Sequence, residues 1–226
     1  MSGSALSSWA LSTDPIHYST KLARTVNCTV AENLAKNYED LLKCLRQVPI
    51  KQLMKPDIEA PRFLSAFAPS IDGVTIEDEH EEMLWKRKDR ASKYDIMLGI
   101  VKNEGLSELS ENQVGYGFEI LERNRIFRTY VRNVYEYHLK EIYATIVNEY
   151  TDWEKSITHP VNIRDNVLQM LADAKYVAPL MNVALALSRA DAKYWLYVFN
   201  YVSKNRVTSQ VRITKILMFQ IFLLKN

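Results

Sequence analysis

The glycines of the chain argue against acyl-transfer chemistry by a serine. A serine nucleophile is commonly presented by a sharp Gly-x-Ser-x-Gly turn, which needs two glycines four residues apart. The six glycines stand at positions 3, 73, 99, 105, 115 and 117, and no two of them have this spacing. We therefore expect that this chain does not carry the nucleophile of a serine hydrolase.

Cys28 and Cys44 are the only cysteines, and their spacing leaves two arrangements open. They are too far apart in sequence for a zinc knuckle, whose ligands sit two to four residues apart. If one helix runs from Thr29 to Val48, the two thiols are free, because a rise of 1.5 Å per residue separates the cysteines by roughly 24 Å. A break near Asn33 to Asn37 would instead allow a disulfide.

Glu104 has the position that most favours a functional site. It follows Tyr94 to Val101, a nearly continuous apolar run of strand length that is typical of a strand buried on both faces of a parallel sheet. Ligand crevices of open α/β sheets form at the carboxyl ends of the strands. The alternative is a solvated loop carboxylate beside the start of a helix.

The elements around Glu104 predict the α/β fold class. A second strand is expected at Tyr194 to Tyr201. Between the two strands we expect helices at Ile126 to Tyr150, Ile163 to Tyr176 and Ala178 to Leu187. A strand, several helices and a further strand indicate a sheet with crossover connections.

The two ends of the chain have different patterns. Asp14 and Pro15 predict a helix that runs to about Val26, with a capping side chain and a proline at the first helical position. Four prolines between positions 49 and 69 predict loop structure. Residues 204–226 carry no acidic side chain, and their apolar stretch from Ile213 to Leu224 predicts a terminal amphipathic helix or a misplaced end.

Composition gives no sign of a nucleic-acid, membrane or cofactor partner. The formal net charge is +2, so no strong field attracts a polyanion. No apolar run reaches the ~20 residues that span a bilayer, so no transmembrane segment is expected. The first residues lack the basic and apolar regions of a signal peptide. No pattern of metal ligands or cofactor motif is found, so we expect no metal and no cofactor.

Several separated motifs, all in one order, resemble landmarks of the carboxylesterase type B family, which is the cholinesterase-like family that includes the neuroligins. These motifs are Met1 to Ala10, Phe67 to Gly73, Tyr94 to Gly105, Glu149 to Glu154, Ala174 to Leu180 and Tyr194 to Tyr201. Arg128 to Asn133 looks most like invertebrate neuroligins. The resemblance covers residues 1–203, and residues 204–226 form a divergent tail.

The resemblance implies a partial α/β-hydrolase fold, in which the triad runs Ser, then Asp or Glu, then His. Glu104 aligns with the triad acid. Only His138 and His159 follow Glu104, and neither precedes a glycine as the family's catalytic histidine does. We expect both to be surface or packing residues, so no functional triad is expected in this chain.

The resemblance also implies an extracellular protein with a disulfide between Cys28 and Cys44, which favours the broken helix. The sequon Asn27-Cys28-Thr29 would then be an acceptor for glycosylation. The family acts at the extracellular face of the plasma membrane.

The partner implied by the resemblance is a neurexin-like cell-surface protein, which neuroligins bind partly through loops that follow the position of Glu104. Leu106 to Gly117 does not match these loops residue by residue, so no binding residue is carried over. A homodimer through the helix at residues 126–150 is also implied, although the late helix that completes that bundle has no counterpart here.

Three functional hypotheses follow. The first is part of a non-catalytic, neuroligin-like adhesion protein that presents a surface to a partner. The second is a fragment of an active carboxylesterase, with its nucleophile and histidine outside this chain. The third is an incomplete gene model with no independent function.

Overall fold

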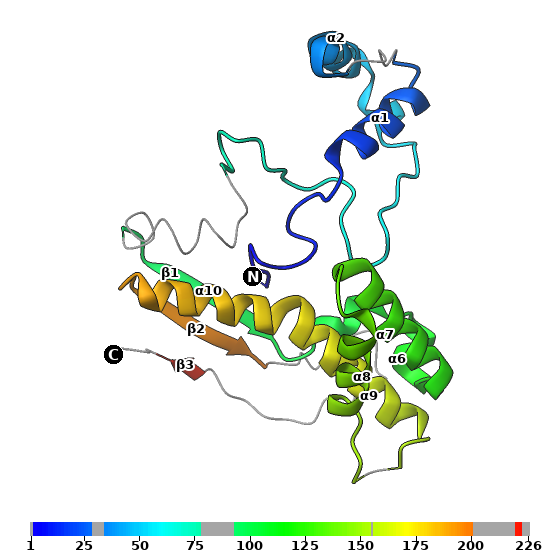
Figure 1. The fold of residues 1–226 in the computed structure, drawn as a ribbon, viewed down its shortest axis with the longest axis vertical. Coiled ribbons are helices and arrows are strands. Elements are labelled where there is room, and N and C mark those ends of the chain that lie inside the picture. The colour runs from blue at the N-terminus through cyan, green and yellow to red at the C-terminus, as the bar shows by residue number, and fades with distance from the viewer. Residues whose placement is uncertain (1, 29–33, 78–92, 155, 201–219, 223–226) are drawn as a thin grey trace. The chain divides into compact units, whose positions relative to one another are not determined.

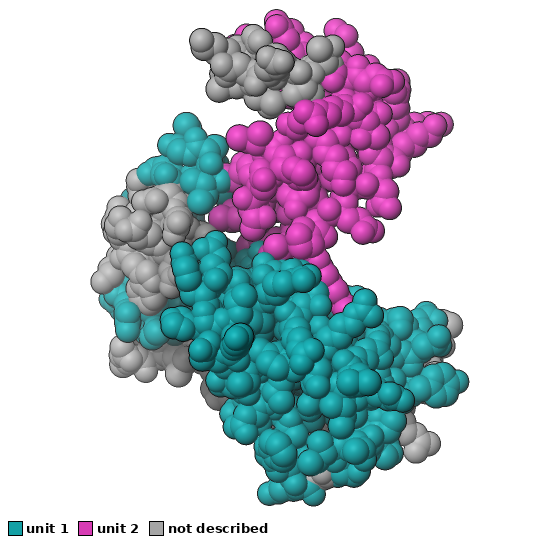
Figure 2. All heavy atoms as spheres, turned by 45° about the vertical axis from the view of Figure 1, so that its right-hand side comes forward, with its two compact units in different colours: residues 1–8, 71–226 teal, residues 9–70 magenta. Residues whose placement is uncertain are grey.

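The computed structural model describes the chain apart from residues 1, 29–33, 78–92, 155, 201–219 and 223–226 (Figure 1). It divides into two compact units, which Figure 2 colours separately: unit 1 comprises Met1–Ser8 and Ile71–Asn226, and unit 2 comprises Trp9–Ser70. The elements of unit 2 are α1 (Pro15–Thr25), α2 (Leu34–Gln47) and α3 (Ile50–Leu53). Those of unit 1 are β1 (Ile96–Val101), η1 (Glu104–Glu108), α6 (Glu111–Tyr116), α7 (Ile120–Val134), α8 (Leu139–Glu149), α9 (Pro160–Ala172), η2 (Asp173–Val177), α10 (Ala178–Arg189), β2 (Tyr194–Phe199) and β3 (Gln220–Phe222).

Helix α1 of unit 2 begins and ends as the sequence predicts. The Asp14 carboxylate accepts a hydrogen bond from the backbone N–H of His17 at 3.0 Å, and Pro15 occupies the first turn. At the other end Asn27 adopts a left-handed conformation with φ of 61°. The N–H groups of Asn27 and Cys28 then bond to the carbonyls of Arg24 and Ala23, which is the Schellman arrangement. This turn sets the position of Cys28.

Cys28 and Cys44 form a disulfide, with their Cα atoms 5.9 Å apart. The alternative of one helix from Thr29 to Val48 is wrong, because α2 begins only at Leu34 and Cys28 belongs to the turn that ends α1. The bridge lies in a small apolar core with Ala23, Val26 and Leu41. After α3, residues 54–77 form neither helix nor strand, which confirms the loop predicted from the prolines.

Unit 1 contains the predicted parallel strand pair. β1 pairs with β2 in a register that runs from Ile96 opposite Tyr194 to Val101 opposite Phe199. The chain between them is helical, so the expected order of strand, helices and strand is confirmed. Helix α10 lies along one face of the strands (Figure 1), where Ala184 and Leu187 pack with Ile96, Leu98 and Leu196.

The prediction that both faces of β1 are buried is wrong. Met97, which points away from the α10 side, is 62% exposed. Gly99 lies on the same face beneath the ring of Tyr197, which fills the space that a side chain would occupy. The uninterrupted apolar run could not reveal this difference, because only α10 among the described helices packs extensively on these strands.

The helix predicted from Ile126 to Tyr150 is wrong as a single element. It is divided into α7 and α8 by residues 135–138, where Tyr135 is extended and His138 is left-handed, with φ of 55°. The apolar spacing already changes at this point, because Val134 and Leu139 are five positions apart instead of three or four. Two shorter helices can therefore pack against each other.

The helices predicted on either side of residue 177 form one continuous helix instead. It runs from Pro160 to Arg189, and the expected boundary is the π-helical turn η2. By length and composition this is the one described helix that could cross a membrane. Core helices of soluble proteins meet the same criterion, and here Ile163, Val167 and Leu171 are at most 1% exposed within unit 1.

The described part of the C-terminal tail is a strand. Gln220–Phe222 forms β3, which pairs antiparallel with β2, so the expected terminal helix is wrong for these three residues. Pairing satisfies N–H and C=O groups that an edge strand would otherwise leave open. Residues 204–219 and 223–226 lie outside the described part of the chain, and the division of the chain at residue 203 remains a prediction.

Candidate functional site at the carboxyl end of β1

Glu104 begins η1, directly after the turn that follows β1, which is where the sequence places it. Its Oε1 accepts a hydrogen bond from the backbone N–H of Val101 at 2.6 Å. The side chain is half-buried, and Oε2 accepts no hydrogen bond from the described residues. The carboxylate therefore caps the end of its own strand and keeps one oxygen available to a partner.

Gly105 fixes the position of Glu104 through close packing. The residue is buried, and a Cβ atom added to it would lie 2.9 Å from the carbonyl oxygen of Leu168 and 3.2 Å from Cβ of Leu171. The turn that carries Glu104 thus rests directly on the backbone of α9, which leaves no room for a side chain.

Replacing Gly105 by alanine is expected to lower the free energy of unfolding of unit 1 by about 1–3 kcal/mol, because the added methyl group must push η1 away from α9. Thermal and urea denaturation measure this change. Gly73→Ala separates the effect of backbone strain from that of steric contact, because Gly73 has open space around its Cβ position but a strained φ of 74°. Equal melting temperatures for Gly105→Ala and the wild type would show that η1 does not rest on α9.

The histidines that follow Glu104 occupy surface positions, as expected. His138 and His159 are exposed residues at the N-terminal ends of α8 and α9, and neither side chain caps its helix. Neither one hydrogen-bonds Glu104. His80 lies outside the described residues.

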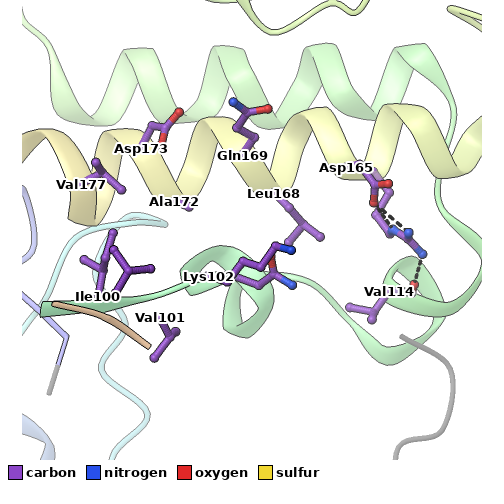
Figure 3. Close-up of a pocket in the computed structure, with 13 residues that line it drawn as sticks. Ile100, Val101, Lys102, Val114, Asp165, Leu168, Gln169, Ala172, Asp173 and Val177 are labelled. Carbon is purple, nitrogen blue, oxygen red and sulfur yellow. Dashed lines mark hydrogen bonds and ion pairs between the residues drawn. The ribbon is translucent and has the colours of Figure 1, made fainter. Parts of the chain in front are cut away.

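A cavity of about 520 Å³ opens at the carboxyl ends of β1 and β2 (Figure 3). Lys102, Asn103 and Val198 line it from the strand side, and Leu168, Gln169 and Asp173 line it from the helix side. Arg164 also lines the cavity, and its guanidinium donates to the Val114 carbonyl at 2.7 Å and to the Asp165 carboxylate at 2.7 Å. Glu104 is not part of the lining, so the crevice and the expected triad acid are separate features.

Metal binding has no support in the described residues. No three histidine, cysteine, aspartate or glutamate side chains gather there in a way that could hold an ion. The two cysteines are joined to each other in unit 2.

Lys175 is a buried cation in the π-helical turn η2. Its side chain is 6% exposed and forms an ion pair with Glu108 of η1, whose side chain is 18% exposed. Its backbone carbonyl accepts a hydrogen bond from the Ser7 hydroxyl at 2.8 Å. Pro179 has no N–H to offer the carbonyl four residues earlier, which is that of Lys175. Ser7 supplies a donor at this position.

The same turn binds the end of α8. The phenolic hydroxyl of Tyr150 donates to Oδ2 of Asp173 at 3.1 Å. Burial raises the pKa of Asp173, and the hydrogen bond from Tyr150 partly opposes that rise. Burial also raises the pKa of Tyr150, with a further contribution from the charge of Asp173. Three segments that are distant in sequence therefore meet at η2: the N-terminal residues, η1 and the end of α8.

Unit 1 is expected to lose stability as the pH rises above about 10, the ordinary pKa of tyrosine. Burial raises the pKa of Tyr130 and of Tyr150, so the folded state keeps phenolic protons that the unfolded chain releases. The free energy of unfolding then falls with rising pH. Denaturant titrations between about pH 8 and pH 11 measure the slope. Tyr130→Phe should flatten this slope. Tyr116→Phe replaces a residue that is 73% exposed and should leave the slope unchanged. Equal slopes in the two variants would contradict the assignment of the pH dependence to the buried tyrosines.

The ion pair at η2 is a feature that the sequence analysis missed. Lys175 and Glu108 are 67 positions apart, and no local pattern links them. One signal was present: Lys175 stands between the apolar stretches of two helices, and Pro179 follows at the distance that frees its carbonyl.

Comparison with known proteins explains this architecture. Residues 1–219 match the Carboxylesterase family. The chain is 33% identical over 215 residues to Neuroligin-1 of Caenorhabditis elegans, which covers 91% of this chain and 27% of that protein. It is 32% identical to human Neuroligin-3 and 28% identical to human Neuroligin-2, each covering 88% of this chain and 23% of the relative.

The chain thus spans about a quarter of the length of the relatives it matches. The match confirms the predicted resemblance to neuroligins. The family implies an α/β-hydrolase fold, and the parallel β1–β2 pair with its helical crossover is consistent with part of one. The chain belongs to the carboxylesterase family and is neuroligin-like within it.

Proposed function

We propose that the chain is part of a non-catalytic, neuroligin-like adhesion protein that binds a neurexin-type partner at the cell surface. The observation that carries the proposal is the similarity to neuroligins over about 90% of the chain, which contains no Gly-x-Ser-x-Gly turn. Glu104 aligns with the triad acid by the family resemblance alone, and its carboxylate accepts a hydrogen bond from the end of its own strand. Adhesion requires a stable surface and no reacting group.

We propose that this surface comprises η1 and α6, residues 104–117. It is held at both ends, because Gly105 packs on α9 and Gly117, with φ of 77°, leaves no space for a side chain against Pro160. Between them Ser110 and Gln113 form a capping box that starts α6. A surface that is ordered before binding loses less conformational entropy when the partner docks.

Tyr116 is the side chain on this surface most suited to a contact, because it is aromatic and 73% exposed. Tyr116→Ala in the full-length protein is expected to weaken binding to a neurexin extracellular region by about tenfold. Tyr137→Ala is the matched control, because Tyr137 is 76% exposed but lies outside residues 104–117. Biolayer interferometry measures both. Equal losses for the two variants, or none for Tyr116→Ala, would remove the assigned surface.

The competing hypothesis of an esterase fragment has its own test. The full-length protein is expected to hydrolyse short acyl esters no faster than buffer does. Turnover above the buffer rate that disappears in Glu104→Gln would show that Glu104 serves a working triad, and the adhesion proposal would then lose its non-catalytic element.

We propose that the implied homodimer uses α8 and not α7. Ile126 and Tyr130 of α7 are 2% and 1% exposed inside unit 1, so they are unavailable to a second copy. The apolar stripe of α8 is only half-buried, and it includes Ile142, Ile146 and Val147. Ile142→Glu should then lower the molar mass measured by light scattering, whereas an unchanged dimer would exclude α8.

We also propose that Asn27 carries an N-linked glycan. It is exposed and lies at the left-handed cap of α1, beside the disulfide. A disulfide is typical of oxidising compartments, where the glycan is also added. Asn27→Gln in the secreted full-length protein should lower its mass by one endoglycosidase-sensitive glycan. An unchanged mass would show that the sequon is unused.

A further inference from the structure

We propose that Lys175 is a positioning residue for the partner surface of residues 104–117, and that it acts through its buried ion pair with Glu108. This inference rests on the proposed adhesion function. It assigns Glu108 to the interior side of the surface, because the Glu108 side chain is 18% exposed and its charge is met by Lys175. Glu108 is therefore not a charged contact for a partner.

Lys175 is well placed to hold η1, because its own position is fixed on two sides. The Lys175 carbonyl accepts a hydrogen bond from the Ser7 hydroxyl at 2.8 Å. The Ser4 hydroxyl donates to the nearby Pro179 carbonyl at 3.0 Å. At the start of the same turn Asp173 accepts from Tyr150. The ammonium group thus extends from a π-helical turn that is tied to two other segments, the N-terminal residues and the end of α8, and π-helical turns of this kind are frequent at functional sites.

Glu108 is well placed to link the position of Lys175 to that of α6. It is the last residue of η1, and Leu109 separates it from Ser110, which caps α6. Gly105, at the other end of η1, rests on α9. An anchor at Glu108 therefore determines the direction in which the chain enters α6, and with it the orientation of Tyr116.

The energetics of buried ion pairs distinguish positioning from stabilisation. Both charges lose hydration when they are buried, so replacing both by apolar groups of similar size is often neutral for stability or even favourable. Removing only one of them leaves an unpaired buried charge and is strongly destabilising. If the pair serves geometry, the double replacement should keep the fold and change the surface.

The test compares Lys175→Met/Glu108→Leu with the wild type in the full-length protein. The double variant is expected to keep its melting temperature, to bind a neurexin extracellular region about tenfold more weakly, and to show faster amide hydrogen exchange in residues 104–117. Lys175→Arg keeps the charge and should bind more tightly than the double variant. The control is Lys193→Met, because Lys193 pairs with Asp95 at 3.4 Å on the surface, where the side chains are 63% and 64% exposed.

The possible results distinguish a failure of the positioning role of Lys175 from a failure of the proposed adhesion function. A wild-type protein that does not bind neurexin overturns the adhesion proposal and this inference together. Binding by the wild type with equal affinity in the double variant overturns the positioning role alone. A double variant that loses its melting transition also contradicts the inference, because the pair would then serve stability. Weaker binding with an unchanged melting temperature and faster exchange supports it.

Discussion

Replacing Phe127 by alanine is expected to lower the free energy of unfolding of unit 1 by about 3–5 kcal/mol. Phe127 is 0% exposed and lies in α7 beside Ile126, Tyr130 and Val131, which are at most 2% exposed. Truncation removes the buried ring and leaves a cavity that close-packed neighbours fill only in part. Urea denaturation followed by circular dichroism measures the change.

Leu121→Ala is the control for this prediction, because Leu121 lies in the same helix and is 79% exposed. It should change stability by less than about 0.5 kcal/mol. A small effect at Phe127, similar to that at Leu121, would mean that α7 is not the core helix of unit 1.

The second large effect concerns the disulfide of unit 2. Reducing the bridge, or replacing both cysteines by serine, is expected to destabilise unit 2 by about 3 kcal/mol, since the bridge joins residues 16 positions apart and restricts the unfolded chain. Hydrogen exchange in α1 and α2 should rise accordingly. The small core around Ala23 and Leu41 is otherwise packed mainly by partly buried side chains, which include Leu22, Leu45 and Leu53.

Unit 1 provides the internal control for this experiment, because it contains no cysteine. Exchange in α7 should be the same with and without reductant. Unchanged protection of α1 and α2 after reduction would show that the helices hold together without the bridge.

The elements that the sequence predicts well are those determined by local chemistry. The aspartate and proline at positions 14 and 15 start α1, and the aliphatic and aromatic runs of β1 and β2 form the expected strands. The site of Glu104 at the end of β1 follows from the abrupt end of the apolar run at Lys102. Each of these features depends on neighbouring residues alone.

Several of the incorrect predictions concern features that depend on distant parts of the chain. Periodicity joined α7 to α8, although the change in spacing after Val134 marked the break. The exposure of Met97 depends on which helices cover the sheet, and β3 depends on pairing with β2. The exposure of Met97 and the pairing of β3 are not encoded in a short window, whereas the break after Val134 was.

The features of the candidate site were also predicted only in part. The position of Glu104 was predicted, but its bond to Val101 and the separate cavity beside α9 were not. The ion pair between Lys175 and Glu108 required the fold, because it joins a helix interior to a distant turn. The family resemblance supplied the pairing of Cys28 with Cys44, which the residues alone left open.

We propose above all that this chain supplies a carboxylate and a binding surface, but no activated serine. Acyl transfer needs a hydroxyl that is deprotonated by an imidazole, and Glu104 could serve only to orient that imidazole. The exposed positions of His138 and His159 and the absence of a Gly-x-Ser-x-Gly turn are consistent with this claim.

Labelling with a fluorophosphonate probe tests the claim most directly, because the probe forms a covalent bond only with an activated serine. The protein is treated with the probe and digested, and peptides from these 226 residues are analysed by mass spectrometry. We predict no adduct on any serine of the chain, with the same result for heat-denatured protein. A stoichiometric adduct on one serine that is lost on denaturation would contradict the claim.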